Sequence, residues 1–391
     1  MRVKLKDIFD LQMGKTPSRS NLEYWNTTDY KWISIADLTK TSKYIFETKE
    51  YLSKSAIKDS GIKVIPANTV VMSFKLSIGK TAITKEDMYS NEAIMAFKDK
   101  HVINIIPEYI FYLFKYKNWE ECSNKAVMGK TLNKATLSEI EVEICSIEKQ
   151  RQIVNILDKI MSAVDGRKQE LQLLDELIKA RFVELFGDPD NNEKSWDIDK
   201  MEHLCEVGSS KRIYQNEQSM EGVPFLRISD LVNRIDTGSK KCDLYIPIEK
   251  LAELKEQGLV PRPGDILLTA RGTLGRCYIV QSDDEFYFQD GMITWLSNYD
   301  RRITALYISY LFEMPGFRKQ IDELQAGSTV AYMSISMTKK LNIMVPPIEL
   351  QNQFADFVKQ VDKSKFDTMT FAPIYDIINL YLHTHFYQGR R

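Results

Sequence analysis

The chain repeats itself, because two stretches of its 391 residues align in the same order at an offset of about 193–201 residues. Residues 32–38 (WISIADL) match residues 225–231 (FLRISDL), and residues 68–73 match residues 264–269. The offset drifts by a few residues, as insertions in surface loops would cause. Solenoid repeats are only about 20–50 residues long, so a period near 200 indicates a duplicated domain. We therefore expect a pseudo-two-fold chain with two similar globular halves.

Each repeat begins with a mixed α/β (α+β) part. Short apolar and β-branched runs at residues 69–72 and 266–269 predict strands, since Gly, Pro and Asn bound them. Amphipathic patterns at residues 107–115 and 305–313 predict helices. Further matches join residues 91–94 to 289–292, 109–113 to 307–311, 129–131 to 327–329, and 147–152 to 348–353.

A long helix follows the α/β part of the first repeat. Apolar residues recur there every three to four positions, which indicates one helical stripe about 40 residues long. Gly187 is the expected C-cap, with Pro189 just beyond it. The second repeat starts the same helix but loses the pattern near Phe366. The residues expected to pack against a partner helix are Ile153, Leu157, Ile160, Val164, Leu171, Leu174, Ile178, Phe182, Phe354, Val358 and Val361.

Basic and hydroxyl side chains lie near glycine in matching loops of the two repeats. Lys and Arg neutralise phosphate, and Arg can read guanine in the major groove. The whole chain carries a net charge of only −1, so any DNA affinity must come from such local patches. The candidate DNA-binding residues are Lys15, Lys75, Lys80, Lys130, Thr131, Lys211, Arg212, Arg271, Thr273, Arg276, Ser328, Thr329 and Tyr332. Solvated loops without a ligand are the plain alternative for any one of them.

Several catalytic functions are disfavoured by the same sequence. Gly-Lys-Thr occurs three times, at Gly14, Gly79 and Gly129, but none has the glycine five residues earlier that a phosphate-binding loop needs. The single Pro-Pro, Pro346-Pro347, lacks the preceding Asn or Asp of an adenine methyltransferase motif. We therefore expect neither nucleotide hydrolysis nor methyl transfer by this chain alone.

The sequence also gives little support for a metal site, a disulfide framework or a membrane span. His383 and His385 have no cysteine or carboxylate cluster beside them, so we expect no metal site. The five cysteines form no Cys-x-x-Cys pair, which fits a reduced cytoplasm. No apolar run approaches the ~18 residues that a membrane span requires.

Three segments resemble the specificity subunits of Type I restriction–modification systems. Residues 174–189 (LDELIKARFVELFGDP) resemble the end of that family's central conserved helix. Residues 345–351 (VPPIELQ) are similar to the junction between a target-recognition domain and its conserved helix. Residues 263–275 (PGDILLTARGTLG) resemble the recognition-domain core. The resemblance covers about residues 1–366.

The resemblance implies a non-catalytic, sequence-specific DNA-binding subunit. Its two target-recognition domains would each bind one half of a split double-stranded DNA site, and its conserved helices would pack as an antiparallel coiled coil. Two modification (methyltransferase) subunits and restriction (motor and nuclease) subunits would assemble on it. S-adenosylmethionine, ATP and Mg would belong to those partners, and this chain would bind no cofactor.

The resemblance also suggests domain boundaries and one departure from the family. The second conserved helix looks shortened, and the final residues have an atypical composition. The alternatives are therefore an inactive or assembly-impaired truncated subunit, a methyltransferase–specificity fusion fragment, or an adaptor that binds no DNA. The expected parts are a first recognition domain at 1–146, the central helix at 147–190, a second recognition domain at 195–346, the shortened helix at 347–366 and the tail at 367–391.

Overall fold

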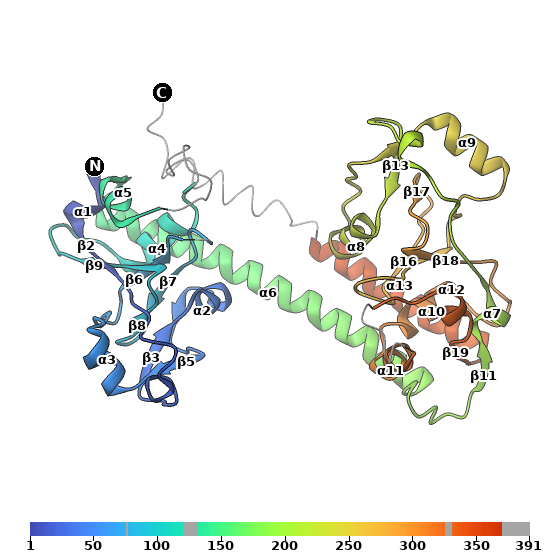
Figure 1. Cartoon of the computed structure of the whole chain (residues 1–391), viewed down its shortest axis with the longest axis horizontal. Helices are drawn as coiled ribbons and strands as arrows, with labels where there is room; N and C mark the ends of the chain where they lie inside the picture. The colour runs from blue at the N-terminus through green and yellow to red at the C-terminus, as the bar shows by residue number, and fades with distance from the viewer. Residues whose placement is uncertain (76, 120–131, 325–330, 370–391) are drawn as a thin grey trace. The chain divides into compact units, whose positions relative to one another are not determined.

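The computed structural model describes residues 1–75, 77–119, 132–324 and 331–369 (Figure 1). The described chain divides into two compact units, one formed by Met1–Lys168 and the other by Gln169–Met369. Helix α6 (Ile147–Phe186) contributes residues to both units. None of the helices in the described ranges combines the length and the apolar character that a membrane span requires.

The first unit is built on a five-stranded sheet with the order β2-β9-β6-β7-β4. Neighbouring strands are antiparallel except β4, which runs parallel to β7. The strands are β2 (Phe9–Met13), β9 (Ile94–Asp99), β6 (Val70–Ser73), β7 (Thr81–Thr84) and β4 (Tyr44–Ile45).

Among its described residues, the first unit also has two smaller sheets and five short helices. One sheet has the order β5-β3-β8, and the other pairs β1 with β10. Their bounds are β1 (Arg2–Lys4), β3 (Tyr30–Ile33), β5 (Glu50–Leu52), β8 (Tyr89–Ser90) and β10 (Glu141–Glu143). The helices are α1 (Leu5–Ile8), α2 (Ile35–Lys40), α3 (Lys54–Ser60), α4 (Pro107–Lys115) and α5 (Lys134–Glu139), with a 3-10 turn η1 (Leu22–Tyr24).

Strand β6 shows why this sheet is buried on both faces. Val70 and Met72 point into the core formed with α4 and the start of α6, whereas Val71 points into a second cluster with Ala82 and Ile94. Successive side chains of a strand face opposite sides, so a strand covered on both faces needs an uninterrupted apolar run. The predicted strand at residues 69–72 and the predicted helix at 107–115 are both confirmed.

The second unit repeats this topology. Its main sheet has the order β12-β18-β15-β16, which matches β2-β9-β6-β7, and its smaller sheets have the orders β14-β13-β17 and β11-β19. The strands are β11 (Asp197–Lys200), β12 (Glu206–Gly208), β13 (Val223–Leu226), β14 (Tyr245–Ile246), β15 (Ile266–Thr269), β16 (Cys277–Ile279), β17 (Tyr287–Phe288), β18 (Ile293–Ser297) and β19 (Asn342–Val345). The helices are α7 (Met201–Leu204), α8 (Ile228–Thr237), α9 (Ile248–Glu256), α10 (Ala305–Leu311), α11 (Pro315–Glu323), α12 (Ile335–Lys339) and α13 (Ile348–Met369), with a 3-10 turn η2 (Gln215–Glu217). The duplication expected from the sequence is therefore confirmed.

Helix α6 has the 40 residues that its apolar stripe predicted. Gly187 caps it with a positive φ of 81°, and its N–H donates to the Val183 carbonyl over 2.8 Å. Helix α13 reaches Met369, at the limit of the described residues.

The second half of α6 pairs with α13 inside the second unit. The rings of Phe182 and Phe186 each lie 5.5–5.6 Å from the ring of Phe354 near the start of α13. Further along, the Lys365 ammonium lies 2.6 Å from the Asp175 carboxylate. Early residues of α13 therefore meet late residues of α6, which makes the pair antiparallel as expected.

Candidate nucleic-acid interface

One loop with the same internal hydrogen bonds follows β6 in the first unit and β15 in the second. The Ser73 hydroxyl accepts from the Lys80 N–H over 3.0 Å and donates to the Ser77 carbonyl. In the second unit, the Thr269 hydroxyl accepts from the Arg276 N–H over 2.9 Å and donates to the Thr273 carbonyl over 2.5 Å. A hydroxyl at the strand end thus closes a seven-residue loop in each unit and fixes the predicted DNA-binding side chains on it.

These loops turn at a matched glycine. The N–H groups of Gly79 and Gly275 each donate over 2.9 Å to the carbonyl of the strand-end residue. Their φ values are +90° and +71°, a conformation that residues with a Cβ rarely adopt. The glycine in each Gly-Lys or Gly-Arg pair therefore shapes the loop, while the neighbouring cation is carried on it.

In the first unit, three loops come together. We call their described residues the first loop cluster, which comprises residues 14–19, 74–75, 77–80 and 91–93. The Lys15 N–H donates to the Ser90 carbonyl over 2.8 Å, and the Phe74 N–H donates to the Ala93 carbonyl over 2.9 Å. The Phe74 carbonyl in turn accepts from the Leu132 N–H over 3.2 Å. These backbone contacts gather side chains that are about 60 residues apart in sequence onto one surface.

The second loop cluster comprises residues 209–213, 270–276, 289–292 and 331–333. The Ala270 N–H donates to the Met292 carbonyl over 2.9 Å, and the Ala270 carbonyl accepts from the Met333 N–H over 2.8 Å. Arg271 and Tyr332 form an isolated antiparallel β-bridge. The structure therefore brings Arg271, Thr273 and the half-exposed Tyr332 into one neighbourhood, although they are far apart in the chain.

The predicted cations differ in how freely they can meet a ligand. Lys80 and Arg271 are exposed, and no acidic group of the described residues lies within ion-pair distance of either. Lys75 is half-buried with its ammonium 5.3 Å from the Phe74 ring centroid. The Lys15 ammonium donates to the carbonyl of Ser60, at the end of α3.

Three other predicted cations already have protein partners. The Arg276 guanidinium lies 2.5 Å from the Asp236 carboxylate of α8, and this contact raises the pKa of Arg276. The Lys211 ammonium lies 3.4 Å from the Gln257 amide oxygen at the end of α9. Arg212 donates through Nε to Asp290 over 2.8 Å. The remaining predicted residues, Lys130, Thr131, Ser328 and Thr329, lie outside the described residues.

An acidic residue that was not among the predicted site residues occupies the same place in both clusters. Glu92 accepts from the Thr16 hydroxyl, and this hydrogen bond, with weaker help from Lys75 and Arg19, lowers the pKa of Glu92. Asp290 is its counterpart in the second unit. The only available signal was the alignment of residues 91–94 with 289–292, which places an acid at the second position of both segments.

The apolar residues predicted for helix packing are divided between the cores of the two units. Ile153 and Leu157 are buried against α4 and the main sheet of the first unit, with Ile160 half-buried beside them. Ile178 and Phe182 are buried in the core of the second unit together with Phe354, Val358 and Val361, while Leu174 packs at its edge. Val164 is buried, and Leu171 is half-buried.

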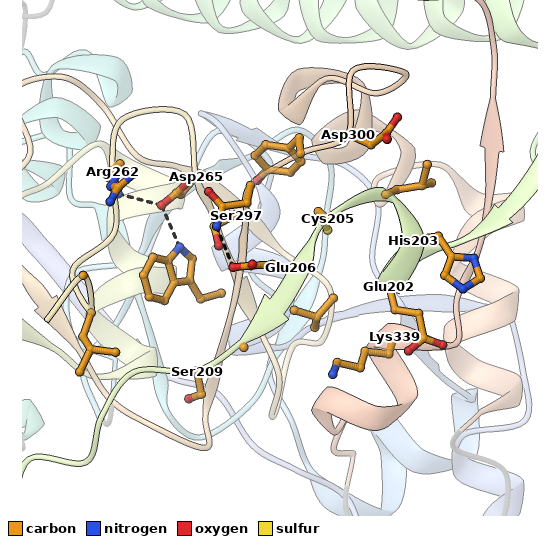
Figure 2. A pocket seen from close by; sticks show the side chains of 18 residues that line it. Glu202, His203, Cys205, Glu206, Ser209, Arg262, Asp265, Ser297, Asp300 and Lys339 are labelled. Carbon is orange, nitrogen blue, oxygen red and sulfur yellow. Dashed lines mark hydrogen bonds between the residues drawn. The ribbon is translucent and has the colours of Figure 1, made fainter.

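A groove of about 690 Å³ opens in the second unit along β12 (Figure 2). Its wall includes Asp265, whose carboxylate accepts from the Trp295 indole N–H over 2.9 Å and from the Arg262 backbone N–H over 2.8 Å. Glu202, Glu206 and Asp300 also line it. With Asp265 they outnumber the two cationic side chains of the lining, Arg262 and Lys339, so the excess negative charge disfavours DNA phosphate there. We therefore place the candidate interface on the loop clusters. The described residues also contain no group of three or more His, Cys, Asp or Glu side chains arranged to hold a metal ion.

Comparison with solved structures shows the same fold. The S subunit of a Type I restriction–modification system from M. genitalium superposes with a TM-score of 0.55 at 13% identity, over 100% of this chain and 96% of that chain. A chain from a structure described as showing complex assembly and conformational transition of the Type I system gives a TM-score of 0.58 at 15% identity, over 98% of this chain and 97% of that one.

Sequence comparison gives the family. The MjaIX specificity subunit of Methanocaldococcus jannaschii is 24% identical over 91% of this chain and 85% of its own length. A putative specificity subunit from Haemophilus influenzae is 30% identical over 61% of this chain and 59% of its own. The family model for the Type I restriction modification DNA specificity domain matches twice, at residues 1–176 and 193–373. The chain therefore belongs to the family of Type I restriction–modification specificity subunits, with two copies of the DNA specificity domain.

Proposed function

We propose that this chain recognises a split double-stranded DNA site, with one loop cluster on each half-site and an unread spacer between them. The observation that carries the proposal is the duplication of the loop cluster. Each unit gathers exposed cations, hydroxyl groups and one carboxylate on loops closed by the same hydrogen bonds. Cations supply phosphate contacts, and side chains on rigid loops can reach base edges in the major groove.

The length of helix α6 supports recognition of a split site. At 1.5 Å per residue, 40 helical residues amount to roughly 60 Å of rod. One turn of B-DNA rises about 34 Å, so a rod of this length is on the scale needed to address successive turns. Ile153, near the start of α6, is buried in the core of the first unit, and Phe182, near its end, is buried in the core of the second.

The proposed partners are two modification subunits and the restriction subunits of a Type I complex. Large apolar side chains remain exposed on α6 after its packing in this chain, with Leu173 at 56% and Leu177 at 48%. Such residues favour a further protein surface on the helix. S-adenosylmethionine, ATP and Mg would be bound by those partners, and this chain would contribute DNA recognition without a catalytic centre.

Methylome sequencing of a host with and without this gene tests the proposal. A two-part motif with a fixed spacer, methylated only when the gene is present, is the expected result. An uninterrupted motif, or no gene-dependent methylation in the presence of the modification subunit, would contradict it.

Calorimetry with S-adenosylmethionine tests the assignment of the cofactor. The chain alone is expected to give no binding heat, whereas its complex with modification subunits should bind the cofactor. Binding by the chain alone would instead support a methyltransferase–specificity fusion.

A further inference from the structure

Among the matched positions at which the two loop clusters differ, one carries Thr16 in the first unit and Arg212 in the second. Both residues follow a lysine, Lys15 or Lys211, at an offset of 196 residues. Both also donate a hydrogen bond to the matched carboxylate, Thr16 to Glu92 and Arg212 to Asp290. The scaffold is thus the same in the two units, and the side chain presented on it is different.

The backbone holds Arg212 in place from both sides. The N–H of Lys211 donates to the hydroxyl of the fully buried Tyr287 over 2.8 Å. On the other side, Ile213 is 7% exposed and belongs to an apolar cluster with Phe225. The segment carrying Arg212 is therefore fixed before any DNA arrives.

The backbone on either side of Asp290 is also held by hydrogen bonds, as it is around Arg212. The N–H of Gln289 donates to the Leu226 carbonyl over 2.9 Å, and the N–H of Gly291 donates to the Ser209 hydroxyl over 3.3 Å. The Asp290 side chain is 21% exposed, compared with 64% for Arg212. The carboxylate therefore lies beneath the guanidinium and leaves the arginine as the outer member of the pair.

The contact through Nε leaves the terminal nitrogens of Arg212 available. A guanidinium has five N–H donors in one plane, and Asp290 uses the one on Nε. Among the described residues, no other group accepts a hydrogen bond from Arg212. Two parallel N–H donors in a fixed plane match O6 and N7 of guanine in the major groove.

The low net charge of the Arg212–Asp290 pair favours binding to a base over binding to a phosphate. Asp290 neutralises Arg212, so the pair offers little net attraction to the phosphate backbone. The same carboxylate keeps the guanidinium plane oriented, which reduces the entropy lost when two hydrogen bonds form with one base. The arrangement therefore suits base reading better than phosphate binding.

We infer that Arg212, oriented by Asp290, reads a guanine in the half-site bound by the second unit, and that position 16 is the corresponding specificity position of the first unit. This inference rests on the proposed function and assigns particular residues to it. Thr16 has no guanidinium fork, so the first unit is expected to impose a different base preference at the equivalent place.

The test compares methylomes of a methylation-free host that expresses the modification subunit together with wild-type chain, Arg212→Ala or Arg212→Lys. Both variants should lose preference for one guanine in one half-site, because neither alanine nor lysine provides a planar fork. Methylation rates on duplexes with and without that guanine should differ for the wild type by roughly 5- to 150-fold and become nearly equal for the variants. Thr16→Ala should leave this half-site unchanged.

Lys255→Ala is the matched control. Lys255 also forms an exposed ion pair, with Glu285 at 3.0 Å, but it lies on α9 outside the loop cluster. It should leave the motif and the rates unchanged. If Arg212→Ala lowers the rate on all duplexes equally while the motif stays intact, Arg212 is a phosphate contact and the inference is overturned. Loss of the two-part motif in the wild type would instead overturn the proposed function and the inference together.

Discussion

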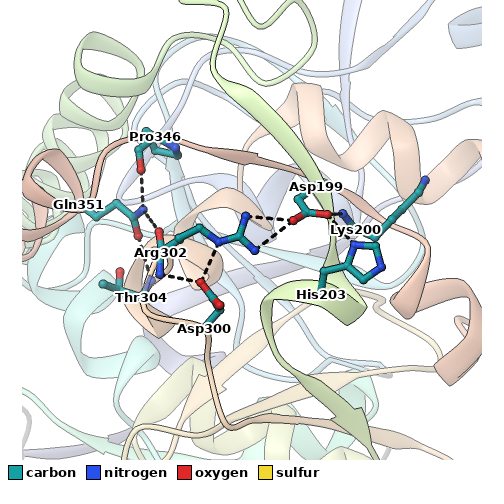
Figure 3. A network of polar contacts seen from close by, with 8 residues as sticks. All are labelled: Asp199, Lys200, His203, Asp300, Arg302, Thr304, Pro346 and Gln351. Carbon is teal, nitrogen blue, oxygen red and sulfur yellow. Dashed lines mark hydrogen bonds and ion pairs between the residues drawn. The ribbon is translucent and has the colours of Figure 1, made fainter.

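Gln150 and Gln351 occupy the same position in the first turn of α6 and α13, and each makes the same three hydrogen bonds. Gln150 donates through Nε2 to the carbonyls of Asn104 and Cys145, both over 3.0 Å, and accepts from the Ile106 N–H over 3.0 Å. In the second unit, the partners of Gln351 are Arg302, Pro346 and Thr304 at 2.8–2.9 Å (Figure 3).

Each glutamine therefore joins three parts of its unit: the long helix, the strand end before it, and the loop that enters α4 or α10. Both side chains are fully buried, at 0% and 1% exposure. Backbone groups buried at such a junction need partners, and one amide side chain supplies three of them. The arrangement fixes the direction in which each helix leaves its sheet.

Replacing Gln351 with alanine is expected to destabilise the second unit by about 2–4 kcal/mol, because it leaves two carbonyls and one N–H without partners in the interior. Urea unfolding combined with hydrogen exchange at α10 and α13 measures this loss. Gln353→Ala, at an exposed position two residues along the same helix, should change stability by less than about 0.5 kcal/mol. Equal effects of the two variants would contradict the role of Gln351.

Phe182 lies at the centre of an aromatic cluster through which the end of α6 packs in the core of the second unit. It is fully buried, stacks on Tyr307 at 5.5 Å and meets Phe186 and Phe354 edge-on at 4.8 and 5.5 Å. Phe182→Ala should cost about 3–5 kcal/mol, since it leaves a cavity among aromatic side chains.

Amide hydrogen exchange in α10 and α13 reports this loss directly, because faster exchange should be confined to the second unit. Leu177→Ala on the same helix is the control, as Leu177 is 48% exposed. Unchanged protection of α13 in Phe182→Ala would show that the helices are held together by other contacts.

Local patterns in the sequence predicted the regular elements well. The apolar stripe and Gly187 predicted α6, and the apolar run at residues 266–269 predicted β15, because helix and strand periodicity act over neighbouring residues. The duplication in the sequence also predicted the repeated topology, since two halves with matching sequences are expected to fold alike. The candidate DNA-binding residues that the structure describes fall on gathered loops.

The partners of those residues could not be predicted in the same way. Arg276 pairs with Asp236 of α8, 40 positions earlier in the chain, and nothing in the local sequence of either residue signals the other. Asp290 likewise reads as an ordinary loop acid until Arg212, 78 positions away, is placed on it. Contacts of this range depend on tertiary packing, so charge counts in loops overstate how many cations face a ligand.

The carboxyl group of Asp199 makes the stability of the second unit depend on pH (Figure 3). Its pKa is lowered from the ordinary 3.8, first by the hydrogen bond with His203 and then by the Lys200 N–H and Arg302. A lowered pKa in the folded state stabilises the fold above pH 3.8, and this stability is lost as the pH falls through the folded-state value.

Asp199→Asn should therefore be less stable than the wild type near pH 7, and the difference should shrink progressively below about pH 4. Urea unfolding at a series of pH values measures it. Asp197→Asn, on the same strand and exposed, is the comparison and should show no such convergence. A wild-type advantage that persisted unchanged to low pH would place the source of stability elsewhere.

Lys80 and Arg276 occupy the same position in the two duplicated loops, yet their surroundings differ. Lys80 is exposed without an acidic partner among the described residues, whereas Arg276 is bound to Asp236 at 2.5 Å. If Lys80 contacts phosphate, Lys80→Ala should weaken DNA binding and reduce the slope of log K against log salt by about 0.9. Arg276→Ala should leave that slope unchanged and lower stability by no more than about 1 kcal/mol, as for a partly exposed ion pair.

Fluorescence anisotropy of a labelled duplex, titrated with the complex of this chain and modification subunits at several salt concentrations, separates the two cases. Asp236→Asn provides the control, because it frees Arg276 without removing its charge and should raise the slope towards that of an additional phosphate contact. If Arg276→Ala reduced the slope as much as Lys80→Ala, the ion pair would have to open on DNA. The two loops would then meet the phosphate backbone in the same way, and positions 80 and 276 would not account for an asymmetry between the units.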